Sequence, residues 1–235
     1  PALPRSCTKC NAHIPVRDVH RARLEHVGVP LLVVVINNDG GHAVLEGRKD
    51  GWTGTVARAH ETGARAWLTM VNDRVSPAGT AVLKDADVVE RMLADPTRRS
   101  EHRAEIVALA KDLGVDGVDV DYENLPAPLR LLFTRFAREL AADLRAQGLL
   151  VSITVQPKSG ESASRGPGAM DWQQLCTIAD RLQVMLYNEH NAATEPGPVA
   201  SLDWISRVAD YGLSACPASK LIPVLKVSGM DWGPD

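Results

Sequence analysis

The sequence alternates short apolar segments with longer amphipathic segments over most of its length. The short segments are rich in Val, Ile and Leu, as strands buried on both faces of a parallel sheet are. They cover residues 31–36, 66–71, 117–123, 149–156, 182–187 and 221–227. Because strands that alternate with helices build parallel sheets with helices outside, this pattern predicts an α/β fold.

The amphipathic segments contain residues that typically begin and end helices. Helices are expected over 101–113, over 128–146, from Asp171 onward and over 201–213. Ser100 is the expected N-cap of the first helix, and Gly114 and Gly148 follow the ends of the first two. Asp171 and Gln174 have the spacing of a capping pair. Each helix can therefore return the chain to the start of another strand.

Repeated strand–helix units predict a (β/α)8 TIM-type barrel. An open doubly wound sheet fits less well, because no glycine-rich phosphate loop follows the first strand. Six strands can be counted in the sequence, whereas a closed barrel needs eight. One more could lie in the atypical segment 1–30, and nothing after Trp232 can supply another. We expect an N-terminal segment over 1–30 and one barrel domain over 31–235, incomplete at its C-terminal end.

The composition argues against two classes of partner. The 26 Lys and Arg residues are balanced by 29 Asp and Glu residues, and the formal net charge of −3 is too small to draw the chain onto nucleic acid or anionic lipid. No apolar run approaches the roughly 20 residues of a membrane-spanning helix. The chain begins Pro-Ala-Leu-Pro, so we expect any signal peptide to be absent or already removed. We expect neither a nucleic acid nor a membrane partner, and the oligomeric state stays open.

The first two of the four cysteines superficially resemble zinc ligands. Cys7 and Cys10 form a CxxC pair that is followed by His13 and His20. The histidines lack the spacing of a zinc finger, and the sequence has no second CxxC motif. We therefore expect no metal site in this segment.

The other two cysteines, Cys176 and Cys216, fall in or just after the helices that follow two successive strands. Such helices are neighbours in a barrel. A disulfide between these cysteines is therefore an alternative to two free thiols, and it would indicate an oxidising compartment.

Three acidic side chains share one face of the predicted strand 117–123. Because side chains alternate along a strand, Asp119, Asp121 and Glu123 point the same way at intervals of roughly 6.6 Å. The two valines and the tyrosine that alternate with them point the other way. In a barrel the apolar face would pack on helices, and the acids would rise toward the C-terminal mouth, where barrel active sites lie. We therefore expect Glu123 to lie at the substrate.

Three carboxylates in a confined interior cannot all be ionised at neutral pH, so at least one proton must be shared. We expect Glu123 to hold it, as a general acid must near neutrality. A metal site is the first alternative, but acids this far apart along a strand do not converge on one ion, and a calcium loop has different spacing. A solvated edge strand is the second, but Val118 and Val120 indicate a buried central strand.

The stretch 116–123, DGVDVDYE, resembles the DxxDxDxE motif of the family-18 glycoside hydrolases, which are the chitinases and their relatives. The segment 151–158 looks like the next barrel strand of that family. The segment 185–190, MLYNEH, resembles the family's MxYDE(H) strand, with Asn where the family commonly has an acid. The segments 196–201 and 229–232 resemble the branch that contains spore-cortex and peptidoglycan N-acetylglucosaminidases and chitobiase.

This resemblance implies a substrate-assisted retaining mechanism, in which the N-acetyl group of the substrate is the nucleophile. It implies that Glu123 protonates the glycosidic oxygen and later activates water. Asp121 would orient the acetamido N–H, and Asp119 would share a proton with Asp121. Tyr187 would bind the acetamido oxygen.

The resemblance also implies the residues that bind the substrate and the nature of that substrate. The binding residues would be Asp116, Met185, Asn188 and Trp232, the last as a stacking platform for a sugar. The partner would be a glycan containing N-acetylglucosamine, either peptidoglycan or a chitin oligosaccharide, with no metal or organic cofactor. Such an enzyme would be secreted or associated with the cell wall. The alternative is a weak or inactive glycan-binding protein on the same barrel, but the intact Glu123 favours an enzyme.

Overall fold

Six parallel strands form the centre of the fold. The computed structural model describes residues 31–37, 43–45, 49–75, 81–191 and 194–229. The parallel strands pair in the order β1 (Leu31–Asn37), β3 (Ala66–Val75), β5 (Gly117–Asp121), β6 (Leu150–Val155), β7 (Arg181–Met185) and β8 (Leu221–Val224). Two short strands are antiparallel, β2 (Ala43–Leu45) beside β1 and β4 (Ala81–Val82) beside β3. The six predicted strands are confirmed.

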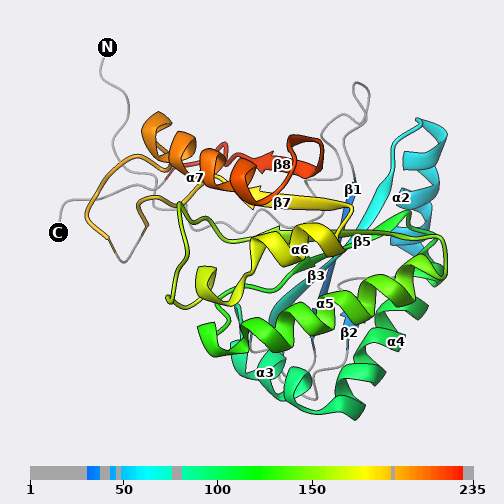
Figure 1. Ribbon diagram of the computed structural model, residues 1–235. Helices are drawn as coiled ribbons and strands as arrows, with labels where there is room; N and C mark the ends of the chain where they lie inside the picture. The colour runs from blue at the N-terminus through cyan, green and yellow to red at the C-terminus, as the bar shows by residue number, and fades with distance from the viewer. Residues whose placement is uncertain (1–30, 38–42, 46–48, 76–80, 192–193, 230–235) are drawn as a thin grey trace.

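Helices connect the parallel strands. The α-helices are α2 (Lys49–Glu61), α3 (Ala86–Ala94), α4 (Pro96–Leu113), α5 (Arg130–Arg145), α6 (Trp172–Ile178) and α7 (Leu202–Ala215), and the short 3-10 helices are η1 (Ala127–Leu129), η2 (Pro167–Ala169) and η3 (Ala218–Lys220). Figure 1 shows α4, α5 and α6 side by side against the sheet, and each contacts the next. The predicted α/β fold is therefore confirmed.

The described strands form an arc of a TIM-type barrel. The main strands lie next to one another in chain order and all run the same way, as in a (β/α) barrel. Within the described part of the chain, β8 pairs with β7 alone and β1 pairs with β2 and β3, so no pairing closes the arc. The strand considered within 1–30, and the predicted domain boundary there, lie outside the described residues.

One predicted helix start was wrong. Helix α4 begins at Pro96, and Asp95 caps it by accepting hydrogen bonds from the backbone N–H groups of Thr97 and Arg98 at 2.8 and 3.2 Å. The first residue of a helix does not use its backbone N–H within the helix, so a proline, which has none, is well suited to that position. The helix therefore begins at Pro96, four residues before the predicted cap Ser100. At the other end, Gly114 takes the left-handed conformation as expected.

The outer face of β5 packs on the helices, as predicted. Val118 and Tyr122 are fully buried, and Val120 is nearly so. The Tyr122 ring stacks on Phe136 of α5 with 5.9 Å between centroids, and its hydroxyl lies 2.5 Å from Nε2 of His102 on α4. β5 is thus a buried central strand, and the alternative of a solvated edge strand is wrong.

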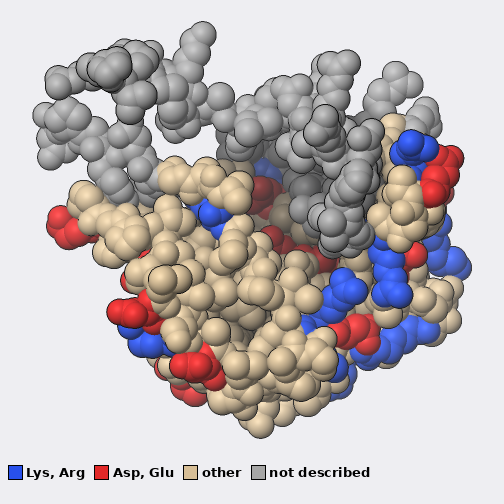
Figure 2. All heavy atoms as spheres, turned by 90° about the horizontal axis from the view of Figure 1, so that it is seen from above, with Lys and Arg blue, Asp and Glu red and all other residues tan. Residues whose placement is uncertain are grey.

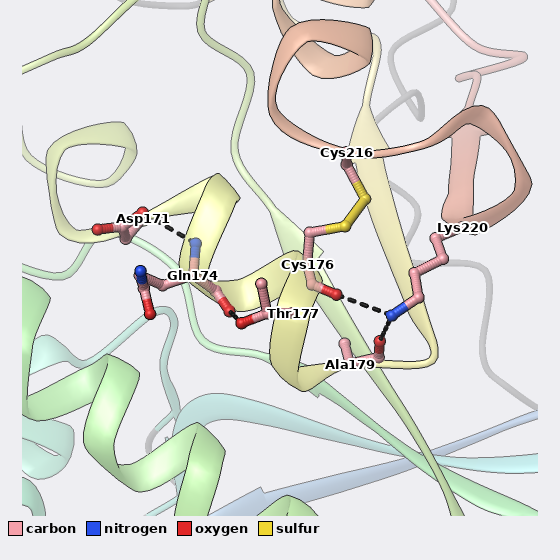
Figure 3. The surroundings of a disulfide bond; sticks show 7 residues. All are labelled: Asp171, Gln174, Cys176, Thr177, Ala179, Cys216 and Lys220. Atoms are coloured by element: carbon pink, nitrogen blue, oxygen red, sulfur yellow. Dashed lines mark hydrogen bonds between the residues drawn. A yellow bond between two sulfur atoms is a disulfide. The ribbon is translucent and has the colours of Figure 1, made fainter.

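A disulfide between Cys176 and Cys216 joins α6 to the end of α7 (Figure 3). The Nζ of Lys220 reaches back from η3 and donates to the carbonyls of Cys176 and Ala179 at 2.9 and 2.8 Å. The pairing considered from the sequence is therefore confirmed. Together these contacts fasten the two helices that flank β7, which carries part of the site described next.

Candidate active site

The three predicted acids follow one another up β5 and just beyond it. Strand β5 lies between β3 and β6, with Asp119 paired to Thr69 on one side and to Ser152 on the other. Asp119 is 2% exposed, Asp121 is partly exposed, and the Glu123 side chain is 14% exposed. The acids therefore run from a buried position within β5 to a more exposed one just beyond its carboxyl end.

Hydroxyl and amide groups from neighbouring strands surround Asp119. Thr154 on β6 donates its hydroxyl to Oδ2 of Asp119 at 2.8 Å, and Gln183 on β7 donates to Ser152 Oγ at 3.1 Å. Burial raises the pKa of Asp119, while hydrogen bonding from Ser152, Gln183 and Thr154 opposes the rise. Polar side chains from two alternate positions of β6 and one position of β7 therefore surround this acid.

Asp121 lies one alternate position further along β5 and has acidic neighbours on both sides. Burial raises the pKa of Asp121 well above its usual value, and repulsion from Asp119 and Glu123 adds to the rise, while Lys84 opposes it. The buried Oδ1 atoms of Asp119 and Asp121 have no hydrogen-bond partner among the described residues. Asp121 thus holds a proton readily and has an acceptor atom that a ligand could satisfy.

Glu123 is held at both its backbone and its carboxylate. Its backbone N–H and C=O bind the side chain of Asn72 at 2.8 and 2.9 Å. Its Oε2 forms an ion pair with the Nζ of Lys84 at 2.7 Å. The sequence predicts that Glu123 holds the proton shared among the three acids Asp119, Asp121 and Glu123, which we call the acidic column. This stays a prediction; the acid whose pKa burial and acidic neighbours raise is Asp121, and the contact that the structure adds at Glu123 is the cation of Lys84.

Lys84 itself is placed by the turn after β4. Its backbone N–H donates to Oδ1 of Asp73 on β3 at 2.7 Å, and Lys84 adopts a positive φ of 54°. Such a φ is uncommon for a residue other than glycine. The turn therefore brings a cation from outside the predicted motif onto the uppermost acid.

Strand β7 brings further polar groups to the interior. Gln183 faces Ser152, and because side chains alternate, Met185 and Tyr187 follow it on the same face. Burial raises the pKa of Tyr187 to about 12, and the charges of the two upper acids add to this rise. Tyr187 is therefore a neutral hydrogen-bond donor near the upper acids. The neighbouring Asn188 accepts a hydrogen bond from Lys226 Nζ at 3.3 Å.

One predicted binding residue, Asp116, does not join this group. Asp116 precedes β5, where its Oδ2 accepts from the backbone N–H of Ala66 at 2.7 Å and lies 2.9 Å from His60 Nε2. Asp116 and Glu123 are seven positions apart, roughly 23 Å along an extended chain, so Asp116 lies at the opposite end of β5. Trp232 lies outside the described residues.

Several site residues were missed by the sequence analysis. They are Asn72, Asp73, Lys84, Ser152, Thr154, Gln156 and Gln183. Polar residues that alternate with apolar ones in 151–155 and 182–185 were a usable signal, because the strand faces predict that they point inward with the acids. Asp73 continues the alternation of Thr69 and Val71, which pair with Asp119 and Asp121, and could have been found by the same rule, whereas the adjacent Asn72 could not. Lys84 had no sequence signal, because its position depends on a turn.

Charged side chains of both signs lie on the described surface (Figure 2). No three His, Cys, Asp or Glu side chains converge to hold a metal ion in the described parts of the chain. On the face shown in Figure 2, described basic and acidic side chains are intermingled, and none of the blue areas is broad. No described helix has the length and apolar character needed to cross a membrane.

Known sequences identify the family. Residues 86–235, more than half of the chain, match the family model described as glycosyl hydrolases family 18. The chain is 32% identical over 146 residues to YdhD of Bacillus subtilis (strain 168), named as a candidate sporulation-specific glycosylase. It is 28% identical over 142 residues to the cortical fragment-lytic enzyme of the same organism. These matches cover 62% and 60% of this chain but 34% and 33% of the relatives, so the chain spans about a third of their length.

Solved structures agree with that assignment. The chitinase of Chromobacterium violaceum ATCC 12472 superimposes with a TM-score of 0.72 and 26% identity, covering 83% of this chain and 59% of that one. The Bacillus cereus spore cortex-lytic enzyme SleL superimposes with a TM-score of 0.72 at 19% identity, over 83% of this chain and 43% of that one, and shows the fold alone. The chain therefore belongs to the glycosyl hydrolases of family 18.

Proposed function

We propose that this chain hydrolyses β-linked glycans of N-acetylglucosamine by substrate-assisted retaining catalysis. The observation that carries the proposal is the column of Asp119, Asp121 and Glu123, which runs along β5 and ends two residues beyond its carboxyl end. The mechanism needs a proton donor at the scissile bond and a second acid that orients the N-acetyl group. Glu123 and Asp121 are the proposed donors of these two groups, Asp121 at the end of β5 and Glu123 two residues beyond it.

Glu123 is the proposed acid and base. Its carboxyl group protonates the glycosidic oxygen while the substrate's acetamido oxygen attacks the anomeric carbon, so the bond to the leaving sugar breaks. The resulting carboxylate then takes a proton from water, which opens the oxazolinium intermediate and restores the acid. The ion pair with Lys84 at 2.7 Å stabilises the carboxylate form that this second half requires.

Asp121 and Tyr187 are the proposed groups that hold the acetamido group. The buried Oδ1 of Asp121 lacks a hydrogen-bond donor among the described residues, and the substrate N–H would provide one. Tyr187 has a pKa of about 12, so its hydroxyl stays protonated and can donate to the acetamido oxygen. Asp119 shares a proton with Asp121 from below. Met185 at the end of β7 and Asn188 three residues beyond it are further proposed binding residues, and Trp232 remains a predicted platform.

The proposed substrates are peptidoglycan or chitin oligosaccharides. The names of the relatives support both, since two concern spore cortex and one is a chitinase. The Cys176–Cys216 disulfide supports a location outside the cytosol, because disulfides persist in oxidising compartments. We therefore propose that the protein is secreted or associated with the cell wall.

Release of a chromophore from a diacetylchitobioside tests the proposal. Glu123→Gln keeps the shape of the side chain but removes its acid and base function, so we expect kcat to fall by at least about 100-fold. Glu90→Gln, an exposed substitution on α3, is the matched control and should leave kcat unchanged. Equal, background-level signals from the wild type and Glu123→Gln would refute the enzyme and favour the glycan-binding alternative.

A further inference from the structure

Glu123 lies beyond the regular pairing of its strand. The ladder between β3 and β5 ends at the pair Val71 and Asp121, and β5 itself ends at Asp121. The proposed proton donor is therefore two residues past the last strand residue. Without other contacts, this part of the backbone would have the freedom of a loop.

A single side-chain amide replaces the missing backbone pair. Asn72 Nδ2 donates to the carbonyl oxygen of Glu123 at 2.9 Å, and the Glu123 N–H donates to Asn72 Oδ1 at 2.8 Å. Asn72 is 1% exposed, and its backbone carbonyl accepts a hydrogen bond from the backbone N–H of Asp85 at 2.8 Å. Two hydrogen bonds from one planar amide fix both the position and the orientation of the Glu123 backbone.

On the other side of β5, the segment after β6 holds Asn124, the residue that follows Glu123. The N–H of Asn124 donates to Oε1 of Gln156, which follows β6, at 2.9 Å, and Gln156 Nε2 donates to Oδ1 of Asn124 at 3.3 Å. Arg165 Nη1 donates to the carbonyl of Asn124 at 2.8 Å. Asn124 has a φ of 57°, so the chain turns sharply directly after Glu123. Side chains from both adjacent strand segments thus bracket the residue that carries the acid.

We propose that Asn72 is a positioning residue that aims the Glu123 carboxyl group at the scissile oxygen. This inference rests on the proposed function of Glu123. A proton donor must come within hydrogen-bond distance of the oxygen it protonates, and a displacement of about 1 Å can cost about 100-fold in rate. Asn72 acts through the backbone of Glu123, so its loss should lower kcat and leave substrate affinity nearly unchanged.

Steady-state kinetics of Asn72→Ala on the chromogenic diacetylchitobioside test the inference. We expect kcat to fall by about 30- to 100-fold and KM to change by less than about threefold. Ile106→Val, a fully buried substitution on α4 outside the site, controls for lost stability and should keep kcat within about twofold. In the Glu123→Gln background, Asn72→Ala should lower the residual rate by less than about threefold, because the two residues act as one unit.

Two further variants and measurements keep the test decisive. Asn72→Asp retains the shape and the acceptor but loses the donor, so it should lower kcat in the same direction if Asn72→Ala does not fold. Crystal structures of either variant should show the Glu123 backbone displaced or disordered relative to the wild type.

The possible failures are distinguishable. If Glu123→Gln is inactive while both Asn72 variants keep kcat within threefold of the wild type, the inference is overturned and the proposed function stands. If the wild type is no more active than Glu123→Gln, the proposed function fails. An unmoved Glu123 in the variant structures would also overturn the inference.

Discussion

Reduction of the Cys176–Cys216 disulfide should destabilise this fold by about 4 kcal/mol. The two cysteines are 40 residues apart in the sequence. In the chain-entropy description, a loop of this length removes about 13 cal/mol/K from the unfolded ensemble, which is about 4 kcal/mol at 25 °C. The closed loop contains β7, Tyr187 and Asn188, so the bond also secures one wall of the proposed site.

Urea unfolding with and without reductant measures this contribution. With a denaturant slope of about 3 kcal/mol/M, the midpoint should fall by about 1.3 M on reduction. Alkylation and peptide mapping establish that the bond is broken in the reduced sample. The double variant Cys176→Ala/Cys216→Ala is the control, and its midpoint should be low and insensitive to reductant. A shift below about 0.3 M in a fully reduced wild type would refute the loop-entropy reasoning.

Two further predictions concern the upper site. Asp121→Asn should lower kcat at least about 100-fold yet raise Tm at pH 7. Burial raises the pKa of Asp121, so the folded chain binds this proton more tightly than the unfolded chain does. Ionisation of Asp121 therefore costs folding stability as the pH rises above about 3.8, and the Asn variant avoids that cost. The gain should vanish below about pH 4, and a lower Tm of the variant at pH 7 in thermal melts would contradict the assignment. Tyr187→Phe should lower kcat by about 10- to 100-fold. Since the pKa of Tyr187 is about 12, wild type and variant should show equal phenolate absorbance up to pH 10. A phenolate signal that appears in the wild type below pH 10 and is lost in the variant would argue against the buried position of Tyr187 beside the acids.

The strands and the acidic column could be predicted because both depend on local periodicity. Alternation along 117–123 was enough to separate the acids from Val118, Val120 and Tyr122, and the structure buries those three under the helices. The start of α4 was mispredicted because Asp95 and Pro96 form a stronger beginning than Ser100. That signal was present in the sequence and was overlooked.

The partners of Glu123 could not be predicted in the same way. Lys84 reaches Glu123 across 39 positions of the sequence, from a turn whose geometry depends on Asp73. The resemblance to the DxxDxDxE motif predicts all four of its acids at the substrate. The first of them, Asp116, instead contacts Ala66 and His60 at the other end of β5. A sequence motif records residues of one strand, and a strand has two ends with different surroundings.

The hydrogen-bond and ion-pair partners along the acidic column indicate where a bound ligand would gain the most binding free energy. Asp119 has hydroxyl and amide groups around it, and Glu123 has a cation and a doubly bound backbone. Asp121 lies between them, with its pKa raised by burial and by its acidic neighbours and with an Oδ1 that no described residue satisfies. An unpaired buried polar atom costs stability, so a substrate N–H that reached Asp121 would relieve a cost already present in the folded chain. Binding energy would therefore be gained beside the group that reacts, rather than at the rim of the site.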